Sequence, residues 1–289
     1  MKKVFVIAGC ALLALSSCKE KGPKINFGND AKAVDTTYVT TVEAAQSKNI
    51  VVEEFTGASC SNCPAARDLL SNIVADPKYT GHVFTMGIHI KNYVQSNPVD
   101  GLYKHDFRTQ KGTDIGNDVY GSVTAMPIAG IDRMPYNGEM LLLKTAWASA
   151  ISNRIAVTPP ANLTVSSSFD QASRTATVKL HVAYTQAIKD PQFVTLSIIE
   201  DSLVDAQEYP NYIDTFYTFN HVLRDYITPT GGTPILANVT IEPGRVYDRT
   251  FTYQLDPSWI PEHCKIIAFL HYYSATSKEI VQAAETEVK

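Results

Sequence analysis

The sequence is poor in several features that mark common classes of protein. Its formal net charge is −4 at pH 7, so it offers no basic patch for a nucleic-acid partner. Only five of its 289 residues are cysteine, which is too few for a disulfide framework in a chain of this size. Beyond one Cys-x-x-Cys, it has no second such pair and no histidine pair at helical spacing. We therefore expect no metal and no cofactor.

Long apolar runs are also scarce, and the first one is too short to span a membrane comfortably. It follows two lysines near the start of the chain, and together they predict a signal peptide over residues 1–17. The run ends in Leu15-Ser16-Ser17-Cys18, which resembles the bacterial lipobox. That resemblance implies that Cys18 carries a lipid after cleavage and holds the protein to a membrane. An ordinary secretory signal with an accidental cysteine is the alternative.

Composition also divides the rest of the chain. Residues 18–36 mix charges, glycine and proline, as expected of a flexible tether. Thr158-Pro159-Pro160 is the clearest boundary, because two prolines stiffen it and the hydrophobic periodicity changes just after it. We therefore predict one domain over 37–157 and a second over 158–289.

The first domain is organised around Cys60 and Cys63. An apolar run rich in β-branched residues over 50–56 predicts a strand, and an amphipathic pattern over 65–75 predicts a helix. Pro64 is tolerated only in a first helical turn, so the helix begins at the cysteines. Two cysteines three apart at that position can close a small disulfide ring, and the helix dipole favours a thiolate there. A reactive Cys60–Cys63 disulfide is therefore expected.

Further elements complete an α/β pattern. A second apolar strand is expected over 82–90, and the segment from 91 to 114 reads as an inserted loop with a short helix. Pro127 heads a third apolar strand, where a proline often marks special backbone geometry, including a cis bond. A helix over 140–155 closes the domain.

Beyond residue 158 the period is two. The run from Arg174 to Tyr184 alternates cleanly between apolar and polar side chains. Six further strand candidates follow the same rule, at 162–169, 193–200, 235–241, 246–255, 265–273 and 278–286. Roughly seven short strands without helices predict an all-β sandwich of the immunoglobulin-like kind.

Three separated features of the first domain resemble the thioredoxin family. Cys60 and Cys63 lie between a strand and a helix, Pro127 heads a later strand as that family's cis-proline does, and Glu54 precedes Cys60 by six positions. In thioredoxins a buried acidic residue occupies this last place. The expected fold is therefore an α/β thioredoxin-like domain followed by an all-β sandwich.

The whole chain resembles, more specifically, the outer-membrane-protein-28-related lipoproteins of Bacteroides-like bacteria. The residues that carry this resemblance are Glu53-Glu54-Phe55-Thr56-Gly57, Cys60-x-Asn62-Cys63-Pro64, Asn220-His221-Val222-Leu223-Arg224 and Ile266-Ile267-Ala268-Phe269. It implies an outer-membrane lipoprotein anchored through Cys18. It leaves open the biochemical activity, the oligomeric state and whether the protein faces the periplasm or the cell surface.

The first functional hypothesis is thiol–disulfide exchange with a protein or peptide substrate. Cys60 would be the attacking thiolate and Cys63 would resolve the mixed disulfide. Glu54, if buried, could carry the Cys63 proton, and Pro127 would place the backbone of Met126 where a peptide could pair with it. The alternatives are a stable or inert disulfide, an exposed Glu54 paired with a lysine, and a trans proline at a strand edge.

The second hypothesis is a non-enzymatic surface-binding protein. Six aromatic residues crowd one stretch of the second domain, namely Tyr209, Tyr212, Phe216, Tyr217, Phe219 and Tyr226. Such a cluster can form a platform for a peptide or a glycan, or it can pack beneath a long loop. His221 is expected to be structural, and Cys264 begins an apolar strand as a buried small hydrophobe.

Overall fold

The structure is a computed structural model that describes residues 35–237 and 239–289. The expected signal peptide, nearly all of the tether and the expected lipid attachment at Cys18 lie outside the described residues. Within the described ranges there are fourteen strands and three α-helices, the helices being α1 (Cys63–Ala75), α2 (Gln110–Asp114) and α3 (Lys144–Ile155). None of the described helices is both long enough and apolar enough to cross a membrane.

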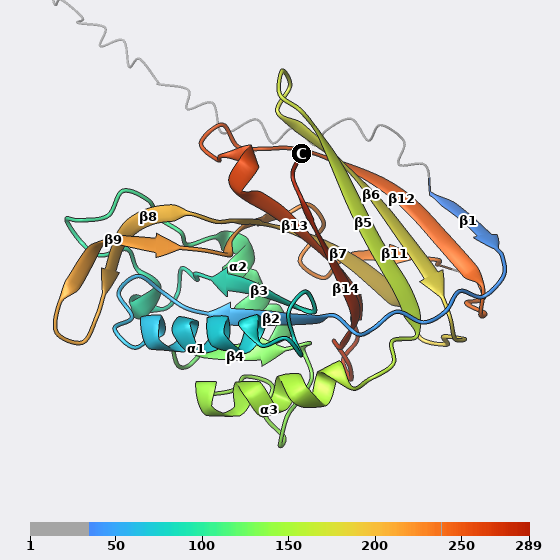
Figure 1. The fold of residues 1–289 in the computed structure, drawn as a ribbon, viewed down its shortest axis with the longest axis horizontal. Coiled ribbons are helices and arrows are strands. Elements are labelled where there is room, and N and C mark those ends of the chain that lie inside the picture. Colours follow the sequence, from blue (N-terminus) through green and yellow to red (C-terminus); the bar gives the residue numbers. More distant parts are fainter. Residues whose placement is uncertain (1–34, 238) are drawn as a thin grey trace, which may run out of the picture. The chain divides into compact units, whose positions relative to one another are not determined.

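Two sheets contain most of the strands (Figure 1). The first has the order β1-β12-β6-β5, from the strands Thr36–Val39, Arg245–Gln254, Thr175–Tyr184 and Ala161–Asp170. The second has eight strands in the order β14-β13-β7-β10-β3-β2-β4, with β11 also paired to β7. These strands are β2 (Ile50–Phe55), β3 (Val83–Ile88), β4 (Ile128–Ile131), β7 (Gln192–Glu200), β10 (Val222–Tyr226), β11 (Thr233–Ile235), β13 (Cys264–Tyr272) and β14 (Ile280–Glu287).

The expected fold class, a thioredoxin-like α/β domain followed by an immunoglobulin-like sandwich, is wrong. The described chain is mostly β, and its three helices have only 13, 5 and 12 residues. Strands from both sides of residue 158 also belong to one hydrogen-bonded sheet, because β10 pairs with β7 on one side and with β3 on the other. The sequence shows each strand's own period but not its partner, so this long-range pairing was missed. The domain boundary at 157/158 stays a prediction.

Local sequence explains why β2 and α1 form where they do. Every residue of β2 is buried, as expected for a strand with parallel pairing to β3 and helices nearby. Helix α1 begins at Cys63 with Pro64 in its first turn, where no intrahelical N–H is needed. Its buried face includes Ala66 and Leu70, and α3 packs beside it.

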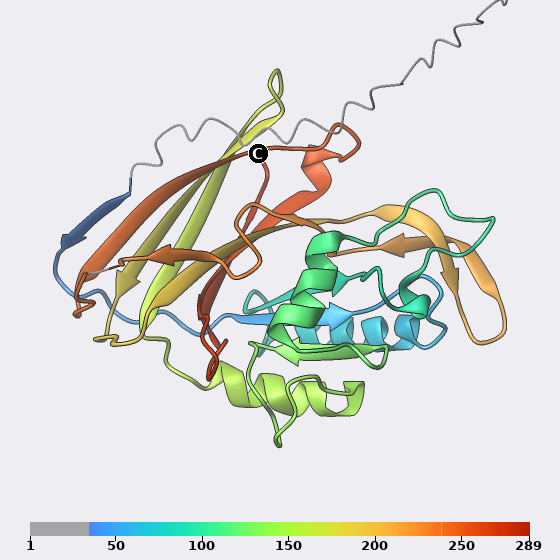
Figure 2. The same cartoon turned by 180° about the vertical axis from the view of Figure 1, so that it is seen from behind.

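Three apolar clusters fill the layers. One lies between the four-stranded sheet and strands β7, β13 and β14, which is the sandwich part of the molecule. A second lies between β2 and the helices α1 and α3. The third lies on the opposite face of β2 and contains both cysteines of the Cys-x-x-Cys pair. Figure 2 shows the sheet from the side on which α2 lies, away from α1. The site therefore lies at β2, next to the edge strand β4 of the eight-stranded sheet, with packed side chains on both faces.

A hairpin that the sequence pattern did not predict extends from this region. It consists of β8 (Leu203–Glu208) and β9 (Ile213–Phe219), joined by a short turn. The stretch of aromatic residues thus forms a β-hairpin followed by β10. The expected strand over 235–241 is reduced to the end of β11, which stops at Ile235.

Candidate functional site

Cys60 and Cys63 form a disulfide at the start of α1. The Cys63 backbone N–H donates to the Cys60 carbonyl oxygen over 3.0 Å, so the ring is also closed by a hydrogen bond. Cys63 is the first residue of the helix, where unpaired N–H groups and the dipole stabilise negative charge. The pair therefore lies where a thiolate is favoured once the disulfide opens.

Both cysteines are buried, with exposed fractions of 1% and 2%. Strand β8 holds the segment that leads into them. The Gln207 side chain donates from Nε2 to the Cys60 carbonyl oxygen over 3.1 Å, and the Glu208 N–H donates to the Ala58 carbonyl oxygen over 2.8 Å. In this state the disulfide is shielded from other proteins, so exchange needs movement of a covering segment.

Pro127 and Met126 lie in the same region. The Met126–Pro127 peptide bond is cis, and Pro127 comes directly before β4. Met126 is buried and belongs to the apolar cluster that contains Cys60 and Cys63. The structure thus brings these four residues together, although no described contact shows a substrate on the Met126 backbone.

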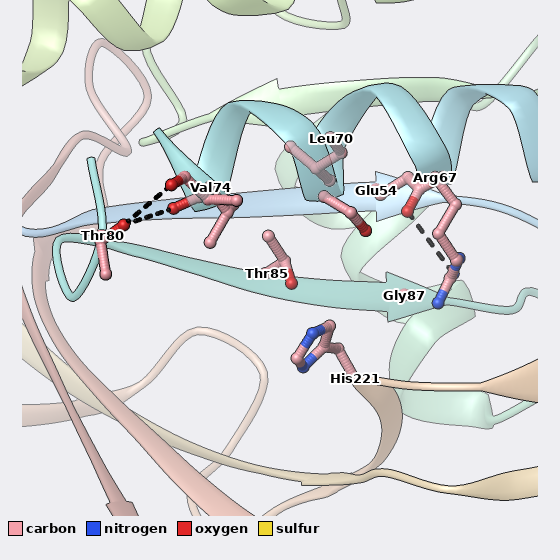
Figure 3. A pocket seen from close by; sticks show the side chains of 10 residues that line it. Glu54, Arg67, Leu70, Val74, Thr80, Thr85, Gly87 and His221 are labelled. Atoms are coloured by element: carbon pink, nitrogen blue, oxygen red, sulfur yellow. Dashed lines mark hydrogen bonds and ion pairs between the residues drawn. The ribbon is translucent and has the colours of Figure 1, made fainter. Parts of the chain in front are cut away.

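Glu54 lies on the other face of β2, beneath α1. It is buried, so the alternative of an exposed carboxylate paired with a lysine is wrong. Its Oε2 lies 3.4 Å from Nη2 of Arg67, which comes one helical turn after Cys63 (Figure 3). Burial raises the pKa of the Glu54 carboxyl, and the charges of Arg67 and His221 oppose that rise. The ion-pair partner of Glu54 is thus an arginine of α1, the helix that begins at Cys63.

Sequence reasoning missed Glu53, which is the centre of a buried polar network. The Arg133 guanidinium donates two hydrogen bonds to Glu53, from Nε to Oε2 over 2.9 Å and from Nη2 to Oε1 over 2.7 Å. The hydroxyls of Tyr120 and Tyr226 donate to the same carboxylate over 2.6 and 3.3 Å. Burial raises the pKa of both tyrosines, and the Glu53 carboxylate holds the Arg133 pKa above its usual range. The sequence signal that could have identified Glu53 was a second charged residue inside an apolar strand.

Cys264 is not a second reactive thiol. It begins β13 and is 1% exposed, which confirms the expected buried small hydrophobe. Burial raises the pKa of its thiol to about 12. Among residues 35–237 and 239–289, no group of three His, Cys, Asp or Glu side chains is arranged to hold a metal ion.

The aromatic stretch is divided between core and surface. Phe219 and Tyr226 are buried, whereas Phe216, in the middle of β9, is 76% exposed. Tyr209 and Tyr212 stack with ring centroids 4.6 Å apart. The hairpin therefore presents a few aromatic faces rather than a continuous platform.

The His221 backbone N–H donates to Asp201 over 2.6 Å, and its ring lies 3.2 Å from the same carboxylate. Its backbone has a positive φ of 58°, in the turn between β9 and β10. The expected structural role fits this turn, and the side chain also lines a cavity that is described below.

The family model described as "Outer membrane protein Omp28" matches residues 116–289. The chain belongs to the Omp28 family. The expected family is thereby confirmed, and the protein is an outer-membrane protein. No curated protein is a significant match to the sequence.

Among solved structures, HBP35 of Porphyromonas gingivalis is similar to this Omp28-family chain with a TM-score of 0.67 and 18% sequence identity. The similarity covers 85% of this chain and 77% of HBP35, and at this identity it concerns the fold alone. A domain of the outer membrane lipoprotein Omp28 from the same organism is 16% identical, with a TM-score of 0.32 over 45% of this chain and 89% of that one.

Proposed function

We propose that this outer-membrane protein exchanges disulfides with client proteins through Cys60 and Cys63. The observation that carries the proposal is a disulfide closed within one turn at the start of α1. Such a small ring stabilises a fold by only about 2 kcal/mol in the chain-entropy account, less than a long loop would. The backbone hydrogen bond from Cys63 to Cys60 already holds the same turn. The sulfur pair is therefore better suited to redox chemistry than to stabilising the fold.

The oxidised state in the structure defines one direction of exchange. A thiolate of a client dithiol attacks Sγ of Cys60, the Cys60–Cys63 bond breaks, and Cys63 leaves as a thiolate that takes a proton. The second client thiolate then attacks the client sulfur of the mixed disulfide and releases Cys60 as a thiolate. The client has been oxidised to a disulfide and the pair reduced to two thiols. The reverse sequence reduces a client disulfide.

Three further residues have proposed roles in this exchange. Glu54 would take and return the Cys63 proton, which a buried carboxyl with a raised pKa suits. Pro127 and Met126 would offer backbone to the client beside the disulfide, because Met126 packs in the same cluster as both cysteines. Access would follow release of β8, whose Gln207 now holds the Cys60 carbonyl.

Single cysteine variants test this mechanism. With a disulfide-bonded model client, Cys63→Ser should accumulate a mixed disulfide through Cys60, because no resolving thiol remains. Cys60→Ser should accumulate none, and both should lose turnover. Mass spectrometry of alkylated protein measures the trapped species. Trapping in Cys60→Ser alone would reverse the assigned roles, and turnover in either variant would refute the mechanism.

The burial of both sulfurs supports a second candidate, a non-enzymatic binding protein with a structural disulfide. The reduction midpoint separates the two. A midpoint between about −120 and −270 mV, as in dedicated exchange proteins, supports exchange, whereas a pair that stays oxidised well below about −300 mV supports the structural disulfide. Equilibration in graded glutathione buffers, with thiols counted by mass after alkylation, measures it.

A further inference from the structure

A cavity of about 320 Å³ lies between α1 and β3, on the face of the sheet away from the apolar cluster that holds the disulfide. One end is charged, with Glu54, Arg67 and His221 (Figure 3). Along α1 the wall is largely apolar and includes Leu70 and Val74. This combination of an apolar wall with a few convergent polar groups is typical of ligand sites.

Among the described residues, β3 has no strand partner at Thr85 beside this cavity, and Thr85 there is 7% exposed. In the part of the chain that the structure describes, β10 pairs with β3 at one residue pair only, Val222 with Gly87, where the Gly87 N–H donates to the His221 carbonyl oxygen over 2.7 Å. Because main-chain groups alternate along a strand, those of Thr85 face the same edge as those of Gly87. From Thr85 back to Val83 no strand neighbours β3 on that side. Thr85 lines the cavity.

Among the described residues, three buried side-chain atoms at this end lack a hydrogen-bond partner, namely Oε1 of Glu54, Nη2 of Arg67 and Nδ1 of His221, the last of which lies 3.2 Å from a carboxylate oxygen of Asp201. Oε1 of Glu54 is buried and accepts no hydrogen bond, and Nη2 of Arg67 donates none, although it lies 3.4 Å from the other oxygen of Glu54. Buried polar atoms without partners are uncommon in native proteins, because each one has lost its hydrogen bonds to water without a replacement. The acceptor Oε1 of Glu54 and the donor Nη2 of Arg67 therefore lie side by side. Together they could bind the N–H and the C=O of a peptide backbone.

The residue at position 87 makes this arrangement possible. A Cβ at Gly87 would lie 2.6 Å from Nη2 of Arg67, so only glycine lets the guanidinium lie over β3 at this point. The other guanidinium nitrogen, Nη1, donates to the Asn220 carbonyl oxygen over 2.5 Å and fixes the group in place. Arg67 is therefore held at the mouth of the cavity rather than free in solvent.

We propose that this groove binds an extended peptide segment of another protein, which adds as a short strand to the open edge of β3 at Thr85. A peptide N–H would donate to Oε1 of Glu54 and a peptide C=O would accept from Nη2 of Arg67. An apolar side chain of the segment would pack on Leu70 and Val74. Addition of a strand to a free sheet edge is an established mode of peptide recognition. The site uses neither cysteine and goes beyond the proposed exchange, although it shares Glu54 with that proposal.

Fluorescence anisotropy with a labelled, amidated Thr-Val-Thr-Val-Thr peptide and the purified full-length protein tests the proposal. The same peptide N-methylated at every residue keeps the side chains but has no N–H to donate. We expect saturable binding of the first peptide and at least about tenfold weaker binding of the second. Equal binding of both, or no saturable binding up to about 1 mM, would overturn the proposal.

Two matched variants locate the binding. Ser71 is exposed on α1 and lines the cavity, so Ser71→Trp should block the groove and weaken binding at least about tenfold. Asn72 is exposed at the next position but does not line the cavity, so Asn72→Trp should bind as the unmodified protein does. Equal effects of both variants would contradict the assigned site.

The double variant Cys60→Ser/Cys63→Ser separates this proposal from thiol exchange. It should bind the peptide unchanged while losing all exchange, since the groove lies on the opposite face of β2 from the cluster that contains the cysteines. Loss of peptide binding in this variant, with its fold intact by circular dichroism, would show that the peptide binds at the cysteines instead.

Discussion

Glu53 and Glu54 are neighbours in β2, yet their carboxylates lie on opposite faces of the same sheet and have different partners. Glu53 is bound by Arg133, and Glu54 faces Arg67. Each glutamate also pairs across the ladder with a glycine, Glu53 with Gly130 of β4 and Glu54 with Gly87 of β3.

Both glycines leave space for a partner of the glutamate beside them. A Cβ at Gly130 would lie 1.9 Å from the hydroxyl oxygen of Tyr120, which donates to Glu53, and one at Gly87 would meet Arg67. β2 can thus carry two buried glutamates because β3 and β4 have glycine, which has no side chain, at the positions that pair with them. Both oxygens of the Glu53 carboxylate accept hydrogen bonds, whereas Glu54 keeps a free acceptor and lines the cavity.

The Glu53 network should be structural. Arg133→Met removes the guanidinium and leaves a buried carboxylate held only by two tyrosine hydroxyls, which should lower the free energy of unfolding by about 3–5 kcal/mol. Urea denaturation followed by circular dichroism measures this. The double variant Glu53→Gln/Arg133→Met should be less destabilised than Arg133→Met, because no unpaired charge remains. A loss below about 1 kcal/mol in the single variant would contradict this account.

His89 should make the fold sensitive to acid. It is buried beside Phe107 and Phe219, and burial lowers its pKa to about 3 from an ordinary value of 6.5. Neither ring nitrogen has a partner of good hydrogen-bond geometry among the described residues, and a contact with the Ser96 backbone offsets little of the burial. The unfolded state therefore takes up the proton first. Between pH 6.5 and about 3 each unit of acidification should cost about 1 kcal/mol of stability from this group.

The variant His89→Phe tests the contribution of His89 to the pH dependence of stability. Phenylalanine keeps the aromatic packing and has no titrating nitrogen, so the fall in stability between pH 6.5 and 4 should become shallower, with little change at pH 7. Urea midpoints at a series of pH values measure the slope. His271 has its pKa lowered to about 3 in the same way, so part of the slope should remain in the variant. An unchanged slope would show that His89 does not contribute.

Local sequence patterns predicted the part of the site that is formed by one continuous segment of the chain. The strand at Ile50–Phe55 and the helix start at Cys63 follow from β-branched residues, a proline limited to the first turn and an amphipathic pattern. The disulfide joins residues three apart, so it too could be expected from spacing. These features depend on no distant contact.

The features that were missed all depend on distant contacts. Arg133 is 80 positions from Glu53, and β10 joins β3 across more than a hundred residues, so neither pairing leaves a trace in the periodicity. That pairing is one reason why the expected fold class, an α/β fold followed by a sandwich, was wrong. The β8–β9 hairpin was missed because β9 shows no apolar alternation: only Phe219 is buried, and the other residues of the strand are exposed or half-buried.

Cys264 should be inert in the folded protein. Its thiol is buried and its pKa is raised to about 12, so very little thiolate is present at pH 8. After mild reduction, iodoacetamide at that pH should label Cys60 and Cys63 but leave Cys264 unmodified until urea unfolds the chain. Peptide mass spectrometry with and without urea measures this. Labelling of Cys264 in the native protein would show that β13 opens readily.

Gln207 should control access to the disulfide. Its amide donates from Nε2 to the carbonyl oxygens of Cys60 and, more weakly at 3.4 Å, of Gly57, and the side chain is buried. Gln207→Ala leaves those carbonyls without this donor, at a cost of about 1–3 kcal/mol, and loosens β8 from the cysteine segment. Reduction of Cys60–Cys63 by dithiothreitol should therefore become several-fold faster, since exchange needs the covering segment to move.

Val204 offers the matched control for this experiment. It lies on the same strand, is 38% exposed and makes no hydrogen bond through its side chain, so Val204→Ala should leave the reduction rate unchanged. Alkylation of samples quenched at intervals gives both rates. If the Gln207→Ala and Val204→Ala rates both equal that of the unmodified protein, β8 is not the barrier to the disulfide. A faster rate in Gln207→Ala alone would show that loosening β8 exposes the Cys60–Cys63 disulfide to dithiothreitol.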